Sequence, residues 1–371
     1  MSGIYVHIPF CKSRCIYCGF YSTIHRELSQ RYVDALCKEL VLRKNYLRYR
    51  PSTIYIGGGT PSQLPIPLLK QIFNTIGSCR NGTEITMECN PEDVTPKYAE
   101  GIKSLRVNRV SMGAQTFDDS RLKFLKRRHK AKQVADAVYN LRQAGIRNIS
   151  IDLMYGFPGE TMDQWRYDID QAISLNVEHL SAYSLMYEEG TTLNRMLQLG
   201  KFSETDEETS RMMYYELIDK LAAAGYEHYE ISNFARKGYR SRHNSSYWQT
   251  VPYLGVGAAA HSFNIESRQW NVADINKYMA SIERGEIPAE RETLYTYTRY
   301  NDTVMLQLRT CEGIDIDAIT TTFGSTLQTF CLNQAQRYIT DGLLEQVDSH
   351  LRLTRKGLFV SDMVMSDLMK V

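Results

Sequence analysis

The chain has 371 residues, which is enough for a large hydrophobic core and for two domains. It is 43% hydrophobic and 23% charged, as globular proteins usually are, and its formal net charge of +2 gives no electrostatic case for a nucleic-acid or membrane-surface partner. The N-terminus has no apolar signal core, and no run is typical of a transmembrane helix, so we expect a cytoplasmic protein that binds no nucleic acid. Its eight cysteines are then thiols or metal ligands rather than disulfides.

The first 230 residues alternate strand-like and helix-like patterns. Strands are predicted at 4–8, 52–56, 84–89, 109–115, 148–154 and 179–185, and helices at 29–46, 67–76, 97–104, 118–125, 132–144, 162–175 and 206–224. Six strand-then-helix units in succession imply parallel strands joined by right-handed crossovers, in either a doubly wound sheet or a barrel. In both architectures ligands bind at the carboxyl ends of the strands.

The regular alternation stops near Glu230, where Gly, Ser, Asn and aromatic residues become frequent. From about Glu292 the pattern is mostly helical, and two short strand-like pieces flank 348–350, which suggests a hairpin of the winged-helix type. Residues 291–371 hold 8 Lys and Arg against 10 Asp and Glu, and this net negative charge argues against DNA binding. We therefore predict three regions: a β/α region at 1–233, an extension at 234–290 and a C-terminal domain at 291–371.

Three cysteines lie within eight positions, as Cys11, Cys15 and Cys18 in the stretch CKSRCIYC. This spacing differs from the paired C-x2-C groups of structural zinc sites. Three thiolates on one short loop suit an iron–sulfur cluster, in which full ligation takes four cysteines, so one iron stays open to a substrate or cofactor. The other five cysteines are scattered singly, and we expect them to be small buried residues.

Polar residues fall at or near the ends of three separate predicted strands, as Glu88, Gln115 and Asp152. In a β/α sheet or barrel these positions converge on the face that carries the cysteine loop. The glycines at 57–59 follow the second strand, and their backbone can approach a ligand closely. Each feature alone is typical of a turn or a solvated strand end, but together they favour a ligand site.

Seven ordered motifs carry a resemblance that runs along nearly the whole chain. The spacing C-x3-C-x2-C after a first strand is similar to the radical S-adenosylmethionine (SAM) superfamily. Within it the chain resembles the branch that contains the oxygen-independent coproporphyrinogen III dehydrogenase HemN and the heme chaperone HemW, in the motifs YVHIPFC, IGGGTPS, ECNPED, SMGAQTF, IDLMYGFPGET, YEISNFA and HNSSYW. The resemblance implies an α/β fold: a partial (β/α)6 TIM-type barrel at 1–233 with a mainly helical, winged-helix-like C-terminal domain.

The resemblance also implies cofactors. The three cysteines would hold a 4Fe–4S cluster whose fourth iron is chelated by the amino and carboxylate groups of SAM. Reduction by an electron donor such as a flavodoxin or ferredoxin would then yield a 5′-deoxyadenosyl radical. His7 is similar to a family histidine, or supports the cluster loop from beneath. The residues that match the family's SAM contacts are Tyr5, Tyr17, Gly58, Gly59, Thr60, Glu88, Gln115, Arg127 and Asp152.

Phe20 departs from the pattern of HemN-type dehydrogenases, which carry an additional, non-ligand cysteine at this position. Phenylalanine cannot ionise, bind metal or exchange hydrogen as a thiol does. Phe20 therefore argues against coproporphyrinogen III oxidation, and it is similar to the HemW pattern, where phenylalanine is usual.

The motif HNSSYW at 243–248 resembles a heme-associated signature of the HemW type. His243 can supply an axial nitrogen to heme iron, and Tyr247 and Trp248 offer flat apolar faces to a porphyrin. Arg240 and Arg242 are candidate partners of heme propionates. His261 in the following small-residue stretch is an alternative histidine.

The leading functional hypothesis is a heme chaperone that binds a 4Fe–4S cluster, SAM and heme and delivers heme to acceptor proteins, including acceptors at the membrane. The alternative is an oxygen-independent coproporphyrinogen III oxidase, which converts coproporphyrinogen III to protoporphyrinogen IX. A radical SAM methyltransferase shares the general architecture. A zinc protein with a DNA-binding winged helix is opposed by the motif series and by the acidic C-terminal segment. The sequence leaves open whether the chain is an enzyme.

Overall fold

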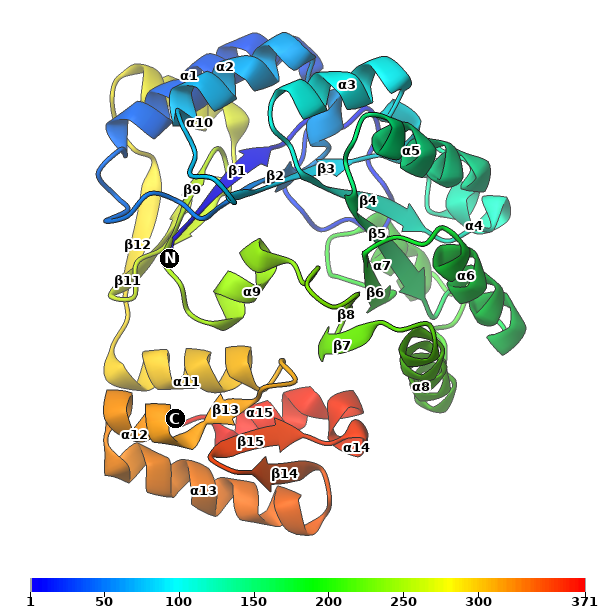
Figure 1. The fold of residues 1–371 in the computed structure, drawn as a ribbon, viewed down its shortest axis with the longest axis vertical. Helices are drawn as coiled ribbons and strands as arrows, with labels where there is room; N and C mark the ends of the chain where they lie inside the picture. Colours follow the sequence, from blue (N-terminus) through cyan, green and yellow to red (C-terminus); the bar gives the residue numbers. More distant parts are fainter. Residues whose placement is uncertain (1, 371) are drawn as a thin grey trace.

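The computed structural model describes residues 2–370, and a central parallel sheet organises the first half of the chain (Figure 1). Its strands lie side by side in chain order, as predicted: β1 (Gly3–Ile8), β2 (Thr53–Gly58), β3 (Glu84–Cys89), β4 (Arg109–Gln115), β5 (Asn148–Tyr155) and β6 (His179–Ser184). The sheet curves but does not close, because β1 and β6 pair with further strands on their outer sides instead of with each other. This is the partial barrel that the resemblance implied.

Helices cover the outer face of the curved sheet (Figure 1). Helix α1 begins at Ser29 and ends at Leu42, four residues before the predicted end. The others lie within two residues of their predicted bounds, except for α7, which the sequence analysis missed. The helices of this half of the chain are α1 (Ser29–Leu42), α2 (Ile66–Ile76), α3 (Pro96–Ser104), α4 (Asp119–Phe124), α5 (Ala131–Gln143), α6 (Met162–Ser174), α7 (Thr192–Gln198), which packs against Ile16 of the cysteine loop, and α8 (Glu207–Ala223), with 3-10 turns η1 (Arg26–Leu28), η2 (Pro61–Gln63) and η3 (Pro91–Asp93).

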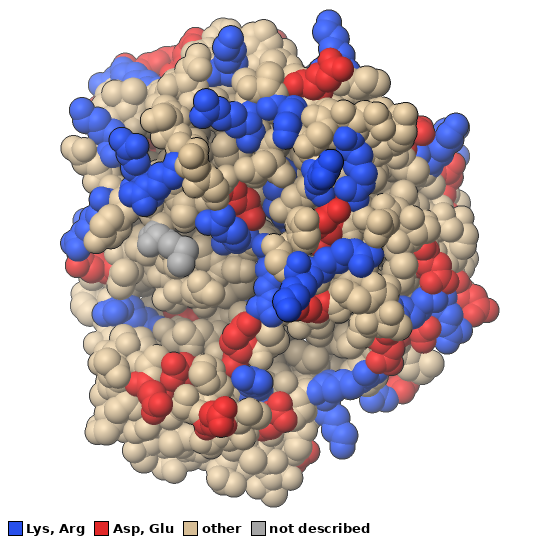
Figure 2. Space-filling view, in the orientation of Figure 1, with Lys and Arg blue, Asp and Glu red and all other residues tan. Residues whose placement is uncertain are grey.

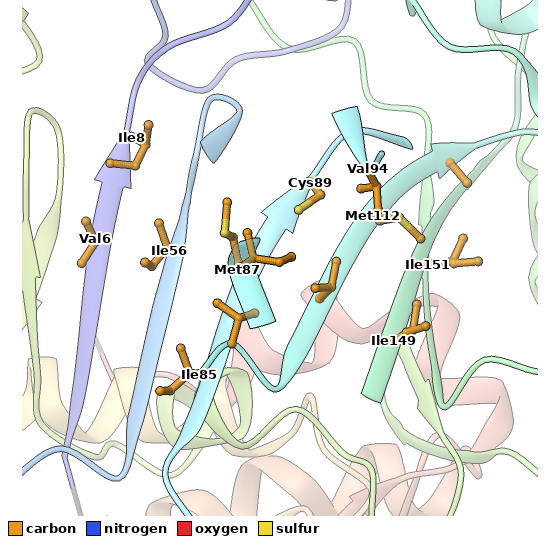
Figure 3. Packing of buried hydrophobic residues seen from close by; sticks show 14 of the residues in the cluster. Val6, Ile8, Ile56, Ile85, Met87, Cys89, Val94, Met112, Ile149 and Ile151 are labelled. Atoms are coloured by element: carbon orange, nitrogen blue, oxygen red, sulfur yellow. The ribbon is translucent and has the colours of Figure 1, made fainter. Parts of the chain in front are cut away.

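Alternate residues of each parallel strand point to opposite faces of the sheet, and this alternation separates the core from the site. The outward set packs under the helices in one continuous apolar layer, part of which is seen in Figure 3 as Val6, Ile8, Ile56, Ile85, Met87, Cys89, Met112, Ile149 and Ile151. The inward set is much more polar. On β4 the inward positions are Arg109, Ser111, Gly113 and Gln115, all of which line a cavity inside the barrel.

Short strands extend the sheet on both sides, and the sequence analysis did not predict them. β7 (Glu227–Glu230) and β8 (Asn233–Ala235) add to β6, whereas β9 (Tyr253–Val256), β10 (His261–Phe263), β11 (Ser267–Asn271) and β12 (Ala289–Thr293) continue from β1. Together with the six parallel strands they form one twelve-stranded sheet. Helix α10 (Ile275–Glu283) packs on α1, and α9 (Arg242–Trp248) lies inside the curve of the sheet (Figure 1).

The C-terminal part has a core of its own, which includes Tyr300, Val304, Cys331 and Leu351. Its elements are α11 (Thr296–Gln307), β13 (Ile314–Asp315), α12 (Ile316–Phe323), α13 (Ser325–Thr340), β14 (Leu344–Val347), β15 (His350–Leu353), α14 (Arg355–Phe359) and α15 (Ser361–Leu368). The hairpin predicted around 348–350 is confirmed as β14 and β15. The predicted domain boundaries stay predictions, and the one at 290 falls within β12.

Charged side chains of both signs are interspersed over the face seen in Figure 2. Along residues 2–370, no helix combines the length and the hydropathy that crossing a bilayer requires.

Candidate functional site

A cavity of about 430 Å³ lies inside the barrel and reaches the cysteine loop. This volume is in the range of small-molecule binding sites. Its lining includes the three predicted cluster ligands, Cys11, Cys15 and Cys18. It also includes every predicted SAM contact except Tyr5, namely Tyr17, Gly58, Gly59, Thr60, Glu88, Gln115, Arg127 and Asp152. The fold therefore brings together at one cavity residues that lie far apart in the sequence, from position 11 to position 152.

The cysteine loop follows β1 and packs against the loop that follows β2. The hydroxyl of Thr60 lies 3.5 Å from Cys11 Sγ, and Nη1 of Arg127 donates to Cys15 Sγ at 3.7 Å. A Cβ on Gly59 would stand 2.8 Å from the Pro9 carbonyl and 3.1 Å from Cys11 Sγ, so only glycine allows this approach.

Burial raises the pKa of the Cys11 and Cys18 thiols. A nearby metal cation reverses this effect, because a coordinating thiol is deprotonated outright. As placed, no three His, Cys, Asp or Glu side chains within residues 2–370 are close enough together to share one metal ion. The donor set of three buried or half-buried cysteines on one loop, beside the cationic Arg127, fits a cluster with one iron left for a further ligand.

Two buried carboxyl groups face the cavity. Glu88 accepts hydrogen bonds from the hydroxyl of Tyr55 at 2.8 Å and from the backbone N–H of Gly58 at 3.0 Å. Burial raises the pKa of Glu88 to about 7 and that of Asp152 to about 6. Both groups are thus ready to accept hydrogen bonds from the amino or hydroxyl groups of a bound ligand, which would favour the ionised form.

Arg127 and Gln115 complete the polar wall of the cavity. Nη2 of Arg127 donates to Asn90 Oδ1 at 2.9 Å and to the Gly113 carbonyl at 2.7 Å, whereas its Nε is buried without a partner. Gln115 has a φ of 66°, at a point where the pairing of β4 with β5 shifts register. A left-handed glutamine at a strand end is unusual, and such backbone positions gather at functional sites.

Tyr5 does not line the cavity, although in the strand register it stands beside Tyr55, which does. The hydroxyl of Tyr5 is 3.1 Å from Nδ1 of His7, and its ring stacks on that of Tyr55 with centroids 6.1 Å apart. Nε2 of His7 is 3.1 Å from the Tyr21 carbonyl, and a Cβ on Gly58, whose φ is 114°, would collide with the His7 ring. Burial lowers the pKa of His7 to about 4, so the ring is neutral. His7 therefore supports the cluster loop and the glycine loop from beneath.

The HNSSYW motif forms helix α9 at the amino ends of the strands, away from the cysteines. His243 is fully buried, with Nδ1 at 2.8 Å from Thr53 Oγ1 and Nε2 at 2.8 Å from the Tyr247 hydroxyl. Its ring stacks on Tyr55, with centroids 5.1 Å apart. Burial lowers the pKa of His243 to about 3. Both ring nitrogens are engaged, so ligation of an iron by His243 requires α9 to move.

The other residues predicted to contact heme also have partners. The guanidinium of Arg309 lies 5.2 Å from the centroid of the Trp248 ring. Arg240 pairs with Glu312 at 2.6 Å, and Arg242 donates to the Gly82 carbonyl. His261 stacks on Trp270 in the β10–β11 pair and does not line the cavity. The heme contacts of this motif remain predictions.

Phe20 lies at the mouth of the same cavity, and its side chain is 72% exposed. A Cβ on the preceding Gly19 would collide with the carboxylate of Glu188, so the loop presses closely on the segment after β6. The position that a thiol would occupy in a HemN-type dehydrogenase thus presents an apolar ring to the cavity mouth.

Part of the cavity lining was not predicted from the sequence. Among these residues are Tyr55, Arg109, Ser111, Ser181 and Tyr183, all at inward positions of the parallel strands. The two-residue alternation counted back from Glu88, Gln115 and Asp152 would have found Arg109 and Ser111, because residues two apart on a strand share a face.

The fold and the cysteine-lined cavity define a radical SAM protein, and the Radical SAM superfamily profile matches residues 5–172. The HemN C-terminal domain profile matches residues 297–360. The structure is similar to that of coproporphyrinogen III oxidase (HemN) from Escherichia coli, with a TM-score of 0.87 and 20% identity over 100% of this chain and 90% of that one.

The chain is 33% identical to the heme chaperone HemW of Bacillus subtilis (strain 168) over 98% of both chains. It is 31% identical to that of Lactococcus lactis subsp. lactis (strain IL1403), over 96% of this chain and 94% of the relative. The chain belongs to the HemW family.

Proposed function

We propose that the protein is a heme chaperone that holds a 4Fe–4S cluster on Cys11, Cys15 and Cys18, binds SAM in the barrel cavity and passes heme to acceptor proteins. The observation that carries this proposal is the presence, in one cavity, of all the predicted SAM contacts but Tyr5 together with Phe20 at the cavity mouth. The lining supports cofactor binding. The missing thiol at position 20 disfavours hydrogen-transfer chemistry of the HemN type.

Each side chain of the cavity has a separate task. The cluster and SAM, when bound, supply one-electron chemistry that the side chains themselves cannot provide. Thr60 and Arg127 flank Cys11 and Cys15 and stabilise their thiolates. Glu88 and Asp152 accept hydrogen bonds from the ligand, and Tyr55 and Gly58 hold Glu88 in place. The apolar ring of Phe20 limits access of water at the mouth.

Heme binding at α9 is the second part of the proposal. His243 is the ligand that supplies a nitrogen, and it becomes available when α9 leaves Thr53 and Tyr55. The acceptor proteins include proteins at the membrane, and a flavodoxin or ferredoxin serves as the electron donor.

One reconstituted sample tests the proposal. After anaerobic cluster reconstitution, hemin is titrated into the wild type and into His243→Ala, with Tyr167→Phe on the exposed face of α6 as the control. We expect the Soret absorbance of bound heme in the wild type and the control, and weaker binding in His243→Ala. No heme binding by the wild type would refute the chaperone function.

The alternative function is coproporphyrinogen III oxidation, and the predicted SAM contacts on the cavity wall, all but Tyr5, favour it. The same sample, given coproporphyrinogen III, SAM and a reductant, distinguishes the two functions. Formation of protoporphyrinogen IX would establish the oxidase, and we expect none.

A further inference from the structure

Arg109 is a buried cation without a charged partner. It is the first residue of β4, it is 1% exposed, and it lines the barrel cavity. No ion pair in the described chain includes its guanidinium, and its Nε has no hydrogen-bond partner. A buried charge is expensive unless it is paired, so an unpaired one calls for a functional explanation.

The neighbours of Arg109 across the sheet also lack partners. In the strand register Thr86 stands opposite Arg109 on β3, and Asn148 stands opposite it on β5. Thr86 Oγ1 and Asn148 Oδ1 are both buried without a hydrogen bond. Buried polar atoms in native proteins are almost always bonded to protein, water or a ligand. Of the three residues only Arg109 lines the cavity, so its guanidinium is the group that a ligand in the cavity can reach.

Three carboxyl groups lie near Arg109 along the strands, Glu84, Glu88 and Asp152, and none forms an ion pair with it. Its charge only opposes the rise in pKa that burial gives Glu88 and Asp152. Asp152 accepts a hydrogen bond from the Ser111 hydroxyl at 3.4 Å. Both oxygens of Glu84 accept backbone N–H groups at the start of α9, from Arg242 and His243. Glu88 accepts from Tyr55 and Gly58. The positive charge of Arg109 is still felt around it. After burial it is the second cause that lowers the pKa of both His243 and His179.

The arginines around α9 are engaged elsewhere. Arg240 pairs with Glu312, Arg309 pairs with Glu230, and Arg242 donates to a backbone carbonyl. Unlike these arginines, Arg109 has N–H donors that are free to bind both oxygens of a carboxylate.

The strand register separates Arg109 from the residues at the cluster end of the cavity. Glu88 pairs with Ser111, which is two residues further along β4, and the strand ends at Gln115. At a rise of about 3.3 Å per residue, Arg109 lies roughly 7 Å below the level of Glu88 and roughly 20 Å below Gln115. Asn244 of α9 also lines the cavity. A group bound by Arg109 thus sits between the SAM residues and the HNSSYW helix.

We propose that Arg109 binds a carboxylate group of a second ligand, which occupies the part of the cavity between the SAM residues and α9. A carboxylate matches the guanidinium in charge and in its two parallel acceptors. Two sources share this chemistry: the propionate of a tetrapyrrole, which rests on the proposed function, and a small free carboxylate, which does not.

Binding measurements on reconstituted full-length protein separate the two sources. Hemin and hemin dimethyl ester, which has no free propionate, are titrated into the wild type, Arg109→Gln and the control Arg147→Gln, whose arginine is exposed. If the ligand is a tetrapyrrole, Arg109→Gln weakens hemin binding roughly 10- to 100-fold, because one charge-assisted bidentate pair is lost. The ester then binds with equal affinity to all three proteins.

A second measurement covers the small carboxylate and does not depend on heme. Sodium propionate is added to the same three proteins, with sodium chloride at equal ionic strength as the reference, and the Tm is recorded. If the ligand is a small carboxylate, propionate raises the Tm of the wild type and of Arg147→Gln but not that of Arg109→Gln. In the absence of any ligand, we expect Arg109→Gln to be as stable as the wild type or more stable, since a buried unpaired charge is removed.

The outcomes distinguish the inference from the proposed function. A wild type that binds no hemin refutes the chaperone function, and the propionate experiment still decides the role of Arg109. Dependence on Arg109 in either the hemin or the propionate experiment supports the inference. If neither depends on Arg109, or if Arg109→Gln loses stability while both ligands bind as in the wild type, Arg109 is structural and the inference is wrong.

Discussion

On the scale of single residues, the site depends on groups held in unfavourable states until a ligand arrives. Burial raises the pKa of Cys11 and Cys18 and of the acid Glu88, and it leaves Arg127 Nε without a partner. Such groups destabilise the empty protein and gain free energy when a cofactor binds. The cavity wall formed by strand ends and motifs therefore also carries side chains with perturbed pKa values.

Replacement of Cys15 by serine tests the assignment of the cluster ligands. We expect Cys15→Ser to lose the iron, the sulfide and the visible absorbance after anaerobic reconstitution, because a serine hydroxyl is a poor ligand for iron–sulfur clusters. The matched control is Cys37→Ser on α1, whose cysteine lies outside the cavity. Equal iron content in the two variants would contradict the assignment.

On the scale of the elements, helix α9 is coupled to the cavity through the side chain of Tyr55, in addition to Asn244 of α9, which lines the cavity. The ring of Tyr55 stacks on His243 of α9, and the Tyr55 hydroxyl donates to Glu88. Displacement of α9 would therefore change the support of Glu88, and any ligand that moves α9 alters SAM affinity, with the reciprocal effect on its own binding.

The variant Tyr55→Phe isolates this connection, because it keeps the stacked ring and removes the hydrogen bond to Glu88. We expect weaker SAM binding by several-fold and a loss of about 1 kcal/mol or less in the free energy of unfolding. Isothermal titration with SAM on the reconstituted protein measures the first quantity. The control is Tyr167→Phe, whose ring is 52% exposed on α6. SAM affinity equal to that of the control would show that α9 and the SAM residues are independent.

The buried His179, the first residue of β6, makes the free energy of unfolding depend on pH with a defined sign. His179 lies between Ser150 and the Tyr229 hydroxyl, and burial lowers its pKa well below 6.5. A depressed folded-state pKa gives stability that is present above pH 6.5 and is lost as the pH falls, by up to about 1.4 kcal/mol per pH unit. Glu88, whose pKa is raised to about 7, acts with the opposite sign, so variants must be compared with the wild type.

Chemical denaturation between pH 7 and pH 5 measures this effect. We expect the free energy of unfolding of His179→Gln to fall less steeply with acid than that of the wild type. His25→Gln, at a histidine whose side chain is 65% exposed, serves as the control. Parallel curves for wild type and His179→Gln would show that His179 does not titrate in this window.

On the scale of the whole molecule, two hydrophobic cores are joined by ion pairs of very different burial. Arg309 of the loop after α11 pairs with Glu230 at 2.9 Å, and the carboxylate side chain is 1% exposed. Arg355 pairs with Asp219 at 2.5 Å, where both side chains are about half exposed. The first pair lies beside Trp248, so the packing of the C-terminal part bears directly on the HNSSYW helix.

Because the two pairs differ in burial, replacing the arginine of each by alanine is expected to change the free energy of unfolding by different amounts. Arg309→Ala leaves Glu230 buried and uncompensated, and we expect a loss of about 1–3 kcal/mol in the free energy of unfolding. Arg355→Ala breaks an exposed pair, with an expected loss of about 0–1 kcal/mol. Urea unfolding of both variants measures the difference. Equal losses would show that Glu230 is solvated in spite of its burial.

The amino-acid sequence alone was enough to predict the six β/α units, the cysteine loop and the strand-end polar residues of the cavity wall. Strand and helix patterns are local, and polar residues at successive parallel strand ends meet at one place whatever the packing of the rest. The positions of Glu88, Gln115 and Asp152 on the cavity wall follow from this rule.

Only the tertiary structure decided which residues from distant parts of the chain contact one another. It kept Tyr5 off the cavity wall, engaged both nitrogens of His243, extended the sheet with β9 and left Nε of Arg109 without a hydrogen-bond partner. The physical reason is that the burial and pairing of a side chain depend on neighbours from other strands. Whether Arg109 meets a carboxylate of the protein depends on residues far from it in the chain, and no local pattern contains that information.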